Sequence, residues 1–97
     1  MNKQLKTAGA YLIKTTGEVK ELEPANGKDF NLEELQGYVG GYIEATQTKD
    51  GRTLIVNEEG KINGLEINSK ATDIYGYYLH DVIVGDAVLI NNEELFK

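Results

Sequence analysis

The sequence predicts an α+β domain whose mostly antiparallel sheet is built from two β-hairpins and a C-terminal strand pair, with one or two short helices. Three observations support this fold class. Two pairs of apolar, β-type segments are each joined by a short turn that contains Gly. A segment with helical apolar spacing and both a start and a stop signal lies between the two pairs. The 97 residues contain no internal repeat or linker-like stretch, so we expect a single domain over residues 1–97.

The predicted strands are rich in aliphatic and aromatic residues and are bounded by turn formers. They cover residues 10–14, 18–23, 42–48, 53–57, 81–84 and 87–90. Gly17 in the first turn can adopt a positive φ, and Asp50-Gly51 in the second turn is typical of a two-residue hairpin loop. Gly85-Asp86 links or bulges the last pair. The consecutive apolar residues 54–56 indicate an interior strand that is covered on both faces.

The first helix has the clearest boundaries. Asn31 and Glu34 have the spacing of a capping box, in which each residue's side chain bonds to the other's backbone N–H. Gly40-Gly41 can end the helix, because Gly accepts the left-handed cap conformation. The residues at helical spacing that would form its apolar stripe are Leu32, Leu35 and Val39.

The C-terminal part is less regular. Residues 71–79 can form a second short helix, with Ser69 or Thr72 as its cap. Residues 91–97 can form one closing helical turn, with Leu95 and Phe96 packed back onto the domain.

Composition excludes several classes of function. Ten Lys and Arg oppose sixteen Asp and Glu, for a net charge of −6, and all of the excess acid lies after residue 24. Binding to nucleic acid or to an anionic membrane surface requires a basic face, so we expect neither. The absence of Cys excludes disulfides, iron–sulfur clusters and a Cys nucleophile. No apolar segment is long enough to span a bilayer and no signal peptide is evident, so we expect a cytoplasmic protein.

Candidate catalytic residues are scarce. Ser69 and His80 are the only Ser and the only His, and Ser69 lies in no nucleophile-elbow pattern. A zinc site needs three or four ligands, and a single His beside scattered acids does not supply them. We therefore expect no enzyme activity, no cofactor and no metal.

Several ordered segments together resemble a family of small uncharacterised domains found in phages, plasmids and Gram-positive bacteria. The resemblance covers about residues 10–91, and its main segments are VGGYIE at 39–44, LIVNEEGK at 54–61 and DVIVGDAVLI at 81–90. Leu35-Gln36, Gly64-Leu65, Asn68 and Ala71 complete the pattern. The family has no settled activity, so the resemblance implies no catalytic residue. It implies an origin in mobile genetic elements, whose small proteins often act on host machinery.

The tyrosines indicate a binding surface. Tyr combines contact area with a polar tip and is enriched at interfaces. We predict an acidic, aromatic partner-binding surface formed by Tyr75, Tyr77, Tyr78, Asp73 and Asp81, joined by Glu58 and Glu59 at the end of a strand. Ordinary packing of some of the rings is the alternative. The polar residues 57–61 can form a ligand or metal loop at a strand end, or a solvated turn with Gly60 at a positive φ. Tyr38 and Tyr42, on either side of the glycine pair, are the candidates for ligand binding.

These observations favour a non-enzymatic acidic binding protein that engages a basic host protein. With the implied origin, the sharpest form of the hypothesis is an anti-defence or regulatory protein, for example an anti-CRISPR that occupies the basic channel of a nucleic-acid-binding nuclease. A protein that binds or sequesters a nucleotide-type ligand is one alternative, and a small enzyme of unknown reaction is a second. Homo-oligomerisation is also open, because the N-terminal hairpin could supply an exposed edge.

Overall fold

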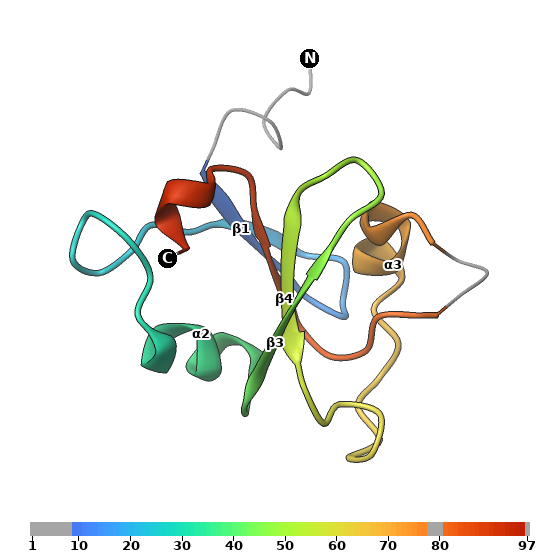
Figure 1. Cartoon of the computed structure of the whole chain (residues 1–97). Coiled ribbons are helices and arrows are strands. Elements are labelled where there is room, and N and C mark those ends of the chain that lie inside the picture. Colours follow the sequence, from blue (N-terminus) through green and yellow to red (C-terminus); the bar gives the residue numbers. More distant parts are fainter. Residues whose placement is uncertain (1–8, 78–80, 97) are drawn as a thin grey trace.

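Five antiparallel strands form a single sheet in the order β2-β1-β5-β4-β3. The computed structural model describes residues 9–77 and 81–96. In chain order its elements are β1 (Ala10–Ile13), β2 (Val19–Glu21), α2 (Leu32–Val39), β3 (Ile43–Gln47), β4 (Thr53–Asn57), α3 (Ser69–Tyr75), β5 (Ala87–Ile90) and the 3-10 turn η1 (Glu93–Leu95). The helices α2 and α3 lie on opposite sides of the sheet (Figure 1). The predicted α+β class is confirmed.

Two apolar clusters, one on each face of the sheet, form the core. The cluster beneath α2 joins Leu35 and Val39 to alternate residues of β1, β4 and β5, including Ile55. The cluster beneath α3 contains the intervening residues of the same strands, including Leu54, together with Ala71. Because side chains alternate along a strand, this double cover explains why three strands are apolar at successive positions. The predicted interior position of β4 is confirmed.

Both hairpin turns are three-residue loops. Lys14 and Glu18 close the first loop, as predicted, with Gly17 at φ 95°. In the second, the N–H of Thr48 donates to the carbonyl of Arg52 at 2.8 Å, so the loop contains residues 49–51. The expected two-residue loop is wrong, because Gly51 takes the left-handed position that follows a tight turn (φ 93°).

The structure confirms both boundaries of α2. The side chain of Asn31 accepts from the N–H of Glu34 at 2.8 Å, and the Glu34 carboxylate accepts from the N–H of Asn31 at 2.9 Å. At the other end Gly40 adopts a left-handed φ of 84° and donates to the carbonyl of Gln36. These contacts satisfy backbone groups that a helix terminus leaves unpaired.

The cap of α3 differs from both predicted residues. Asn68 is the cap, and its side-chain oxygen accepts from the N–H of Ala71 at 3.0 Å. Its side-chain amide also donates to the carbonyls of Ile13 and Gly85, at 2.9 and 2.8 Å. One fully buried side chain therefore joins the helix start to β1 and to the chain entering β5. The helix ends at Tyr75, earlier than predicted, because Gly76 takes the left-handed conformation.

Residues 81–84 do not form the predicted strand and make only a single bridge, between Val84 and Ile67. The backbone of Ile83 bonds instead to α3: its carbonyl accepts from the N–H of Asn68 at 2.8 Å, and its N–H donates to the Thr72 hydroxyl at 2.9 Å. The last strand therefore pairs with β1 and β4 in the middle of the sheet rather than with its own predecessor.

The C-terminal prediction is confirmed as far as residue 96. Residues 93–95 form a single 3-10 turn, and Leu95 and Phe96 pack against the cluster beneath α2. Among the residues that the structure describes, no helix has the length and apolar character needed to cross a membrane.

Candidate functional site

A pocket of about 170 Å³ lies over the β3–β4 end of the sheet, on the face that carries α3. Segments far apart in the sequence form it: both strands of the second hairpin, the turn after β4, the end of α3 and the chain that leads to β5. Its lining residues are Glu44, Thr46, Val56, Asn57, Glu58, Lys61, Ile62, Tyr75, Asp81, Val82, Ile83 and Val84.

The strand register supplies the floor of the pocket. Glu44 of β3 lies opposite Val56 of β4, so the two side chains share the face that carries α3. Thr46, two residues along β3, lies on this face as well. The rim is apolar and accessible, because Ile62 is 85% exposed and Val82 is 37% exposed. A ligand seated here would cover apolar surface that the described part of the chain leaves open.

The charges of the pocket are unbalanced. Among the described residues, Glu44, Glu58 and Asp81 contribute three carboxylates to the lining, against the single cation Lys61. Lys61 forms an ion pair with Asp81, which lies twenty residues later. The Lys61 ammonium and the N–H of Val82 lower the pKa of the Asp81 carboxyl below its usual value. Glu44 and Glu58 have no cation of the described chain within ion-pairing distance.

The turn after β4 approaches the pocket wall closely. A Cβ atom on Gly60 would lie 2.8 Å from Cγ2 of Val84, so only glycine allows this contact. The expectation of a positive φ at Gly60 is wrong, because the positive-φ glycines of the described chain do not include it. Close packing against Val84, and not turn geometry, explains this glycine.

The structure brings only some of the predicted partner-binding residues together. Glu58, Tyr75 and Asp81 line the pocket. Tyr77 makes an edge contact with Tyr75, with ring centroids 5.2 Å apart. Asp73 and Glu59 are exposed but do not line the pocket. Tyr78 lies outside the described residues, as does His80.

The pocket also contains residues that were not among the predicted site residues, including Glu44, Lys61, Ile62 and Val82. For Glu44 and Thr46, the only indication in the sequence is that side chains alternate along a strand, which places both on the same face. Nothing in the local sequence indicates that residues 61–62 and 81–82 meet.

The two tyrosines predicted to bind a ligand do not share a site. Tyr38 lines an open hollow of about 330 Å³ between the end of α2 and the residues around Gly85. Of the lining residues that the structure describes, the charged ones are Glu66 and Asp86 and none is Lys or Arg, so the hollow disfavours phosphate groups. Tyr42 is 65% exposed and lines neither cavity.

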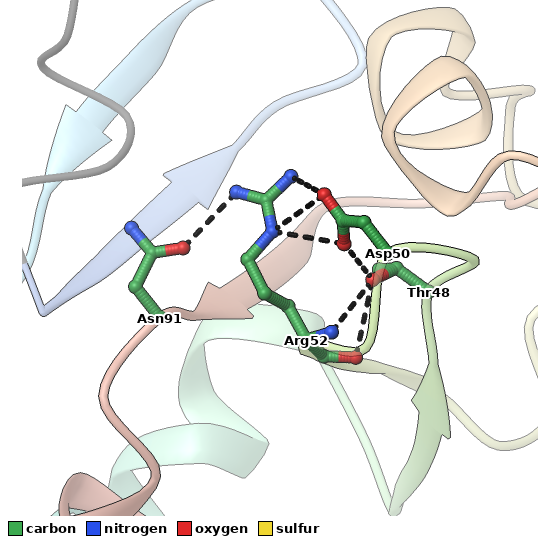
Figure 2. Close-up of polar contacts among 4 residues, drawn as sticks. All are labelled: Thr48, Asp50, Arg52 and Asn91. Carbon is green, nitrogen blue, oxygen red and sulfur yellow. Dashed lines mark hydrogen bonds and ion pairs between the residues drawn. The ribbon is translucent and has the colours of Figure 1, made fainter.

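A polar cluster anchors the loop of the second hairpin (Figure 2). Asp50 accepts from Arg52 at 2.7 Å and also from the hydroxyl of the buried Thr48. Hydrogen bonds from Arg52 and Thr48 lower the pKa of Asp50 to about 2. Arg52 also donates to the side chain of Asn91 at 3.1 Å, which ties the loop to the end of β5. Asp50 and Arg52 form an ion pair with each other, so we assign this cluster a structural role in the hairpin beside the pocket.

Within residues 9–77 and 81–96, no group of three or more His, Asp and Glu side chains is arranged to hold a metal ion. No curated protein and no solved structure gave a significant match to the chain. One family model, described as a domain of unknown function (DUF3846), matches residues 8–96. The resemblance to a family of uncharacterised domains is thereby confirmed over nearly the whole length, and the chain belongs to the DUF3846 family.

Proposed function

We propose that this domain is a non-enzymatic binding protein whose carboxylate pocket engages a basic segment of a partner protein. One observation carries the proposal. Glu44, Glu58 and Asp81, from three separate segments, line one accessible pocket in which Lys61 is the only cation that the described part of the chain provides.

The walls of the pocket suit a long cationic side chain. Lys and Arg bury an aliphatic stem against apolar groups while the charged head stays among polar ones. Here Val56 and the Tyr75 ring can receive the stem, and Glu44 and Glu58 can receive the head. A volume of about 170 Å³ is below the roughly 300–1,000 Å³ of small-molecule sites. The pocket therefore favours one inserted side chain over a whole nucleotide.

The overall charge supports a basic partner as well. A net charge of −6 on 97 residues attracts a positive surface at long range and accelerates association. We propose that the partner is a host protein and that the domain has an anti-defence or regulatory role in the cytoplasm on behalf of a mobile element. Inhibition of a nucleic-acid-binding nuclease such as a CRISPR effector is the sharpest form of this proposal.

A charge-reversal experiment tests the proposal. The tagged protein is expressed in a host cell, retained partners are identified, and each purified partner is titrated against a pocket variant, Glu44→Lys/Glu58→Lys. The matched control is Glu21→Lys/Glu23→Lys, which changes the net charge equally at exposed positions around β2, at the opposite edge of the sheet. We expect the pocket variant to weaken binding by more than about tenfold, which corresponds to 1.4 kcal/mol. We expect the control to retain most of the affinity.

Equal losses of affinity in both variants would show that only the net charge matters, and would refute the pocket as the binding site. The anti-defence role is tested separately, by the survival of phage or plasmid in cells with an active CRISPR nuclease. We expect protection by the wild-type protein and none by the pocket variant. A thermal-shift screen addresses the nucleotide-binding alternative, because a ligand that binds the folded state raises Tm.

A further inference from the structure

The outer edge of β3 lies beside the carboxylate pocket and pairs with no strand of residues 9–77 and 81–96. The N–H of Glu58 donates to the carbonyl of Tyr42, and the N–H of Thr48 donates to that of Arg52, both at 2.8 Å. In an antiparallel pair hydrogen-bonded and non-bonded positions alternate, so even-numbered residues of β3 face β4. The N–H and C=O groups of residues 43, 45 and 47 therefore point away from the sheet. No described residue bonds to them.

This edge has little of the protection usual for edge strands. Natural proteins block such edges with Pro, charged side chains (especially Lys), a bulge, a very short strand or a covering segment, and here Glu44 is the single charge. The sequence of β3 is IEATQ, without Pro or Lys, and its five residues pair with β4 in regular register. Its central residue, Ala45, is exposed and has a small side chain, so another backbone can approach closely. The opposite edge, β2, has only three residues, one of which is Lys20.

We propose that β3 accepts an extended basic segment of the partner protein as a sixth strand, with a Lys or Arg opposite Glu44. This inference rests on the proposed function and specifies its mode of recognition. Strand addition obtains affinity from main-chain hydrogen bonds and specificity from alternate side chains. A residue directly opposite Glu44 projects onto the same face of the sheet, with its Cβ about 5 Å away, and that face carries the pocket.

The charge pattern selects the occupant. The backbone of Glu58 bonds to that of Tyr42, so the added-strand residues opposite Tyr42 and Glu44 are the ones near the two carboxylates. These residues are two apart in the added strand, so both face the pocket side. Glu44 is the only charged residue of β3 and Glu58 lines the same pocket, so cationic side chains at these alternate positions are favoured. A second copy of this acidic chain would bring net −6 against net −6, which disfavours self-pairing at this edge.

The test uses a defined probe, the acetylated and amidated peptide Thr-Lys-Thr-Lys-Thr-Lys-Thr, titrated into the full chain and followed by NMR. We expect hydrogen exchange at the amides of Ile43, Ala45 and Gln47 to slow in the complex. Ala45→Pro removes an outward N–H without removing a bond to β4, and we expect it to weaken binding by more than about tenfold. The control is made at Glu21, whose N–H points outward from β2. We compare Glu21→Pro with Glu21→Ala, so that the two variants differ by the same Ala-to-Pro change, and we expect them to bind the peptide equally.

A second peptide, N-methylated at alternate residues, removes the partner's donors without altering the protein. It keeps the test decisive should Ala45→Pro unfold the sheet, and we expect it not to bind. One outcome overturns strand addition and leaves the proposed function intact: the pocket charge reversal abolishes binding of the peptide, but neither Ala45→Pro nor N-methylation of the peptide weakens it. No binding of the unmodified peptide, where a basic protein is still retained, overturns strand addition as well. A dimer in light scattering that Ala45→Pro converts to monomer assigns the edge to a second copy and refutes the inference.

Discussion

Asn68 is predicted to be the most sensitive polar residue of the fold. Its fully buried side chain makes three hydrogen bonds, at 2.8 to 3.0 Å, to Ile13, Gly85 and Ala71. These bonds hold the start of α3, the end of β1 and the entry to β5 together. Asn68→Ala would remove all three bonds and leave their partners inside the core.

The magnitude follows from these contacts. A hydrogen bond contributes about 1 kcal/mol net, and a buried group left unpaired costs about 1–3 kcal/mol. Three such bonds, one of them a helix cap, therefore predict a loss of about 3–5 kcal/mol. A domain of this size has a stability of about 5–15 kcal/mol, so the variant should be close to its unfolding threshold. At about 4–8 °C per kcal/mol, Tm should fall by more than about 10 °C.

Urea unfolding followed by circular dichroism measures this loss. Asn92→Ala is the matched control, because Asn92 caps η1 with a single exposed bond to Glu94, and it should cost less than about 1 kcal/mol. Asn68→Asp keeps the acceptor for Ala71 but loses both donors and buries a charge, so it should not restore stability. A loss below about 1.5 kcal/mol for Asn68→Ala, or recovery in Asn68→Asp, would contradict the reasoning.

Three further predictions concern the cap, the loop cluster and the pocket wall. Asn31→Ala removes the capping box of α2 and should cost about 1 kcal/mol in urea unfolding, whatever the pH between 6 and 8. The folded-state pKa of Asp50 is lowered to about 2, so its stabilisation is complete above about pH 4 and is lost as the pH falls toward 2. Because this carboxylate is 56% exposed, the effect should be at most about 1 kcal/mol, and stability curves of Asp50→Asn should lack it. Gly60→Ala should lower the free energy of unfolding by about 1–3 kcal/mol, because its new Cβ meets Val84. In a double-mutant cycle, Val84→Ala should recover part of this loss, and strictly additive effects would contradict the contact.

Local signals in the sequence located most elements correctly. The capping box of Asn31 and Glu34, the stop at Gly40 and both hairpins depend on residues close together in the chain, so spacing alone predicts them. The segment 81–84 was assigned wrongly for the opposite reason. Its apolar pattern suits a strand, but the backbone of Ile83 bonds to Asn68 and Thr72 of the α3 region, which no local pattern reveals.

The candidate site shows the same division. Glu58, Tyr75 and Asp81 were selected as acidic or aromatic surface residues, and the structure brings them into one pocket. Glu44 and Lys61 were missed, because their part in the pocket depends on the β3–β4 register and on an ion pair between residues 61 and 81. Asp73 has the same chemistry but lies outside the pocket.

The sequence by itself determined the α+β class, the start of the first helix at Asn31, the presence of a hairpin around Gly51 and the acidic charge, because each depends on neighbouring residues or on composition. Only the tertiary structure decided that β5 lies in the middle of the sheet, that Asn68 caps α3, and that Glu44, Glu58 and Asp81 line one pocket beside the open edge of β3. The physical reason is that these features arise from contacts between segments tens of residues apart, which are chosen by how the whole chain buries both faces of its sheet.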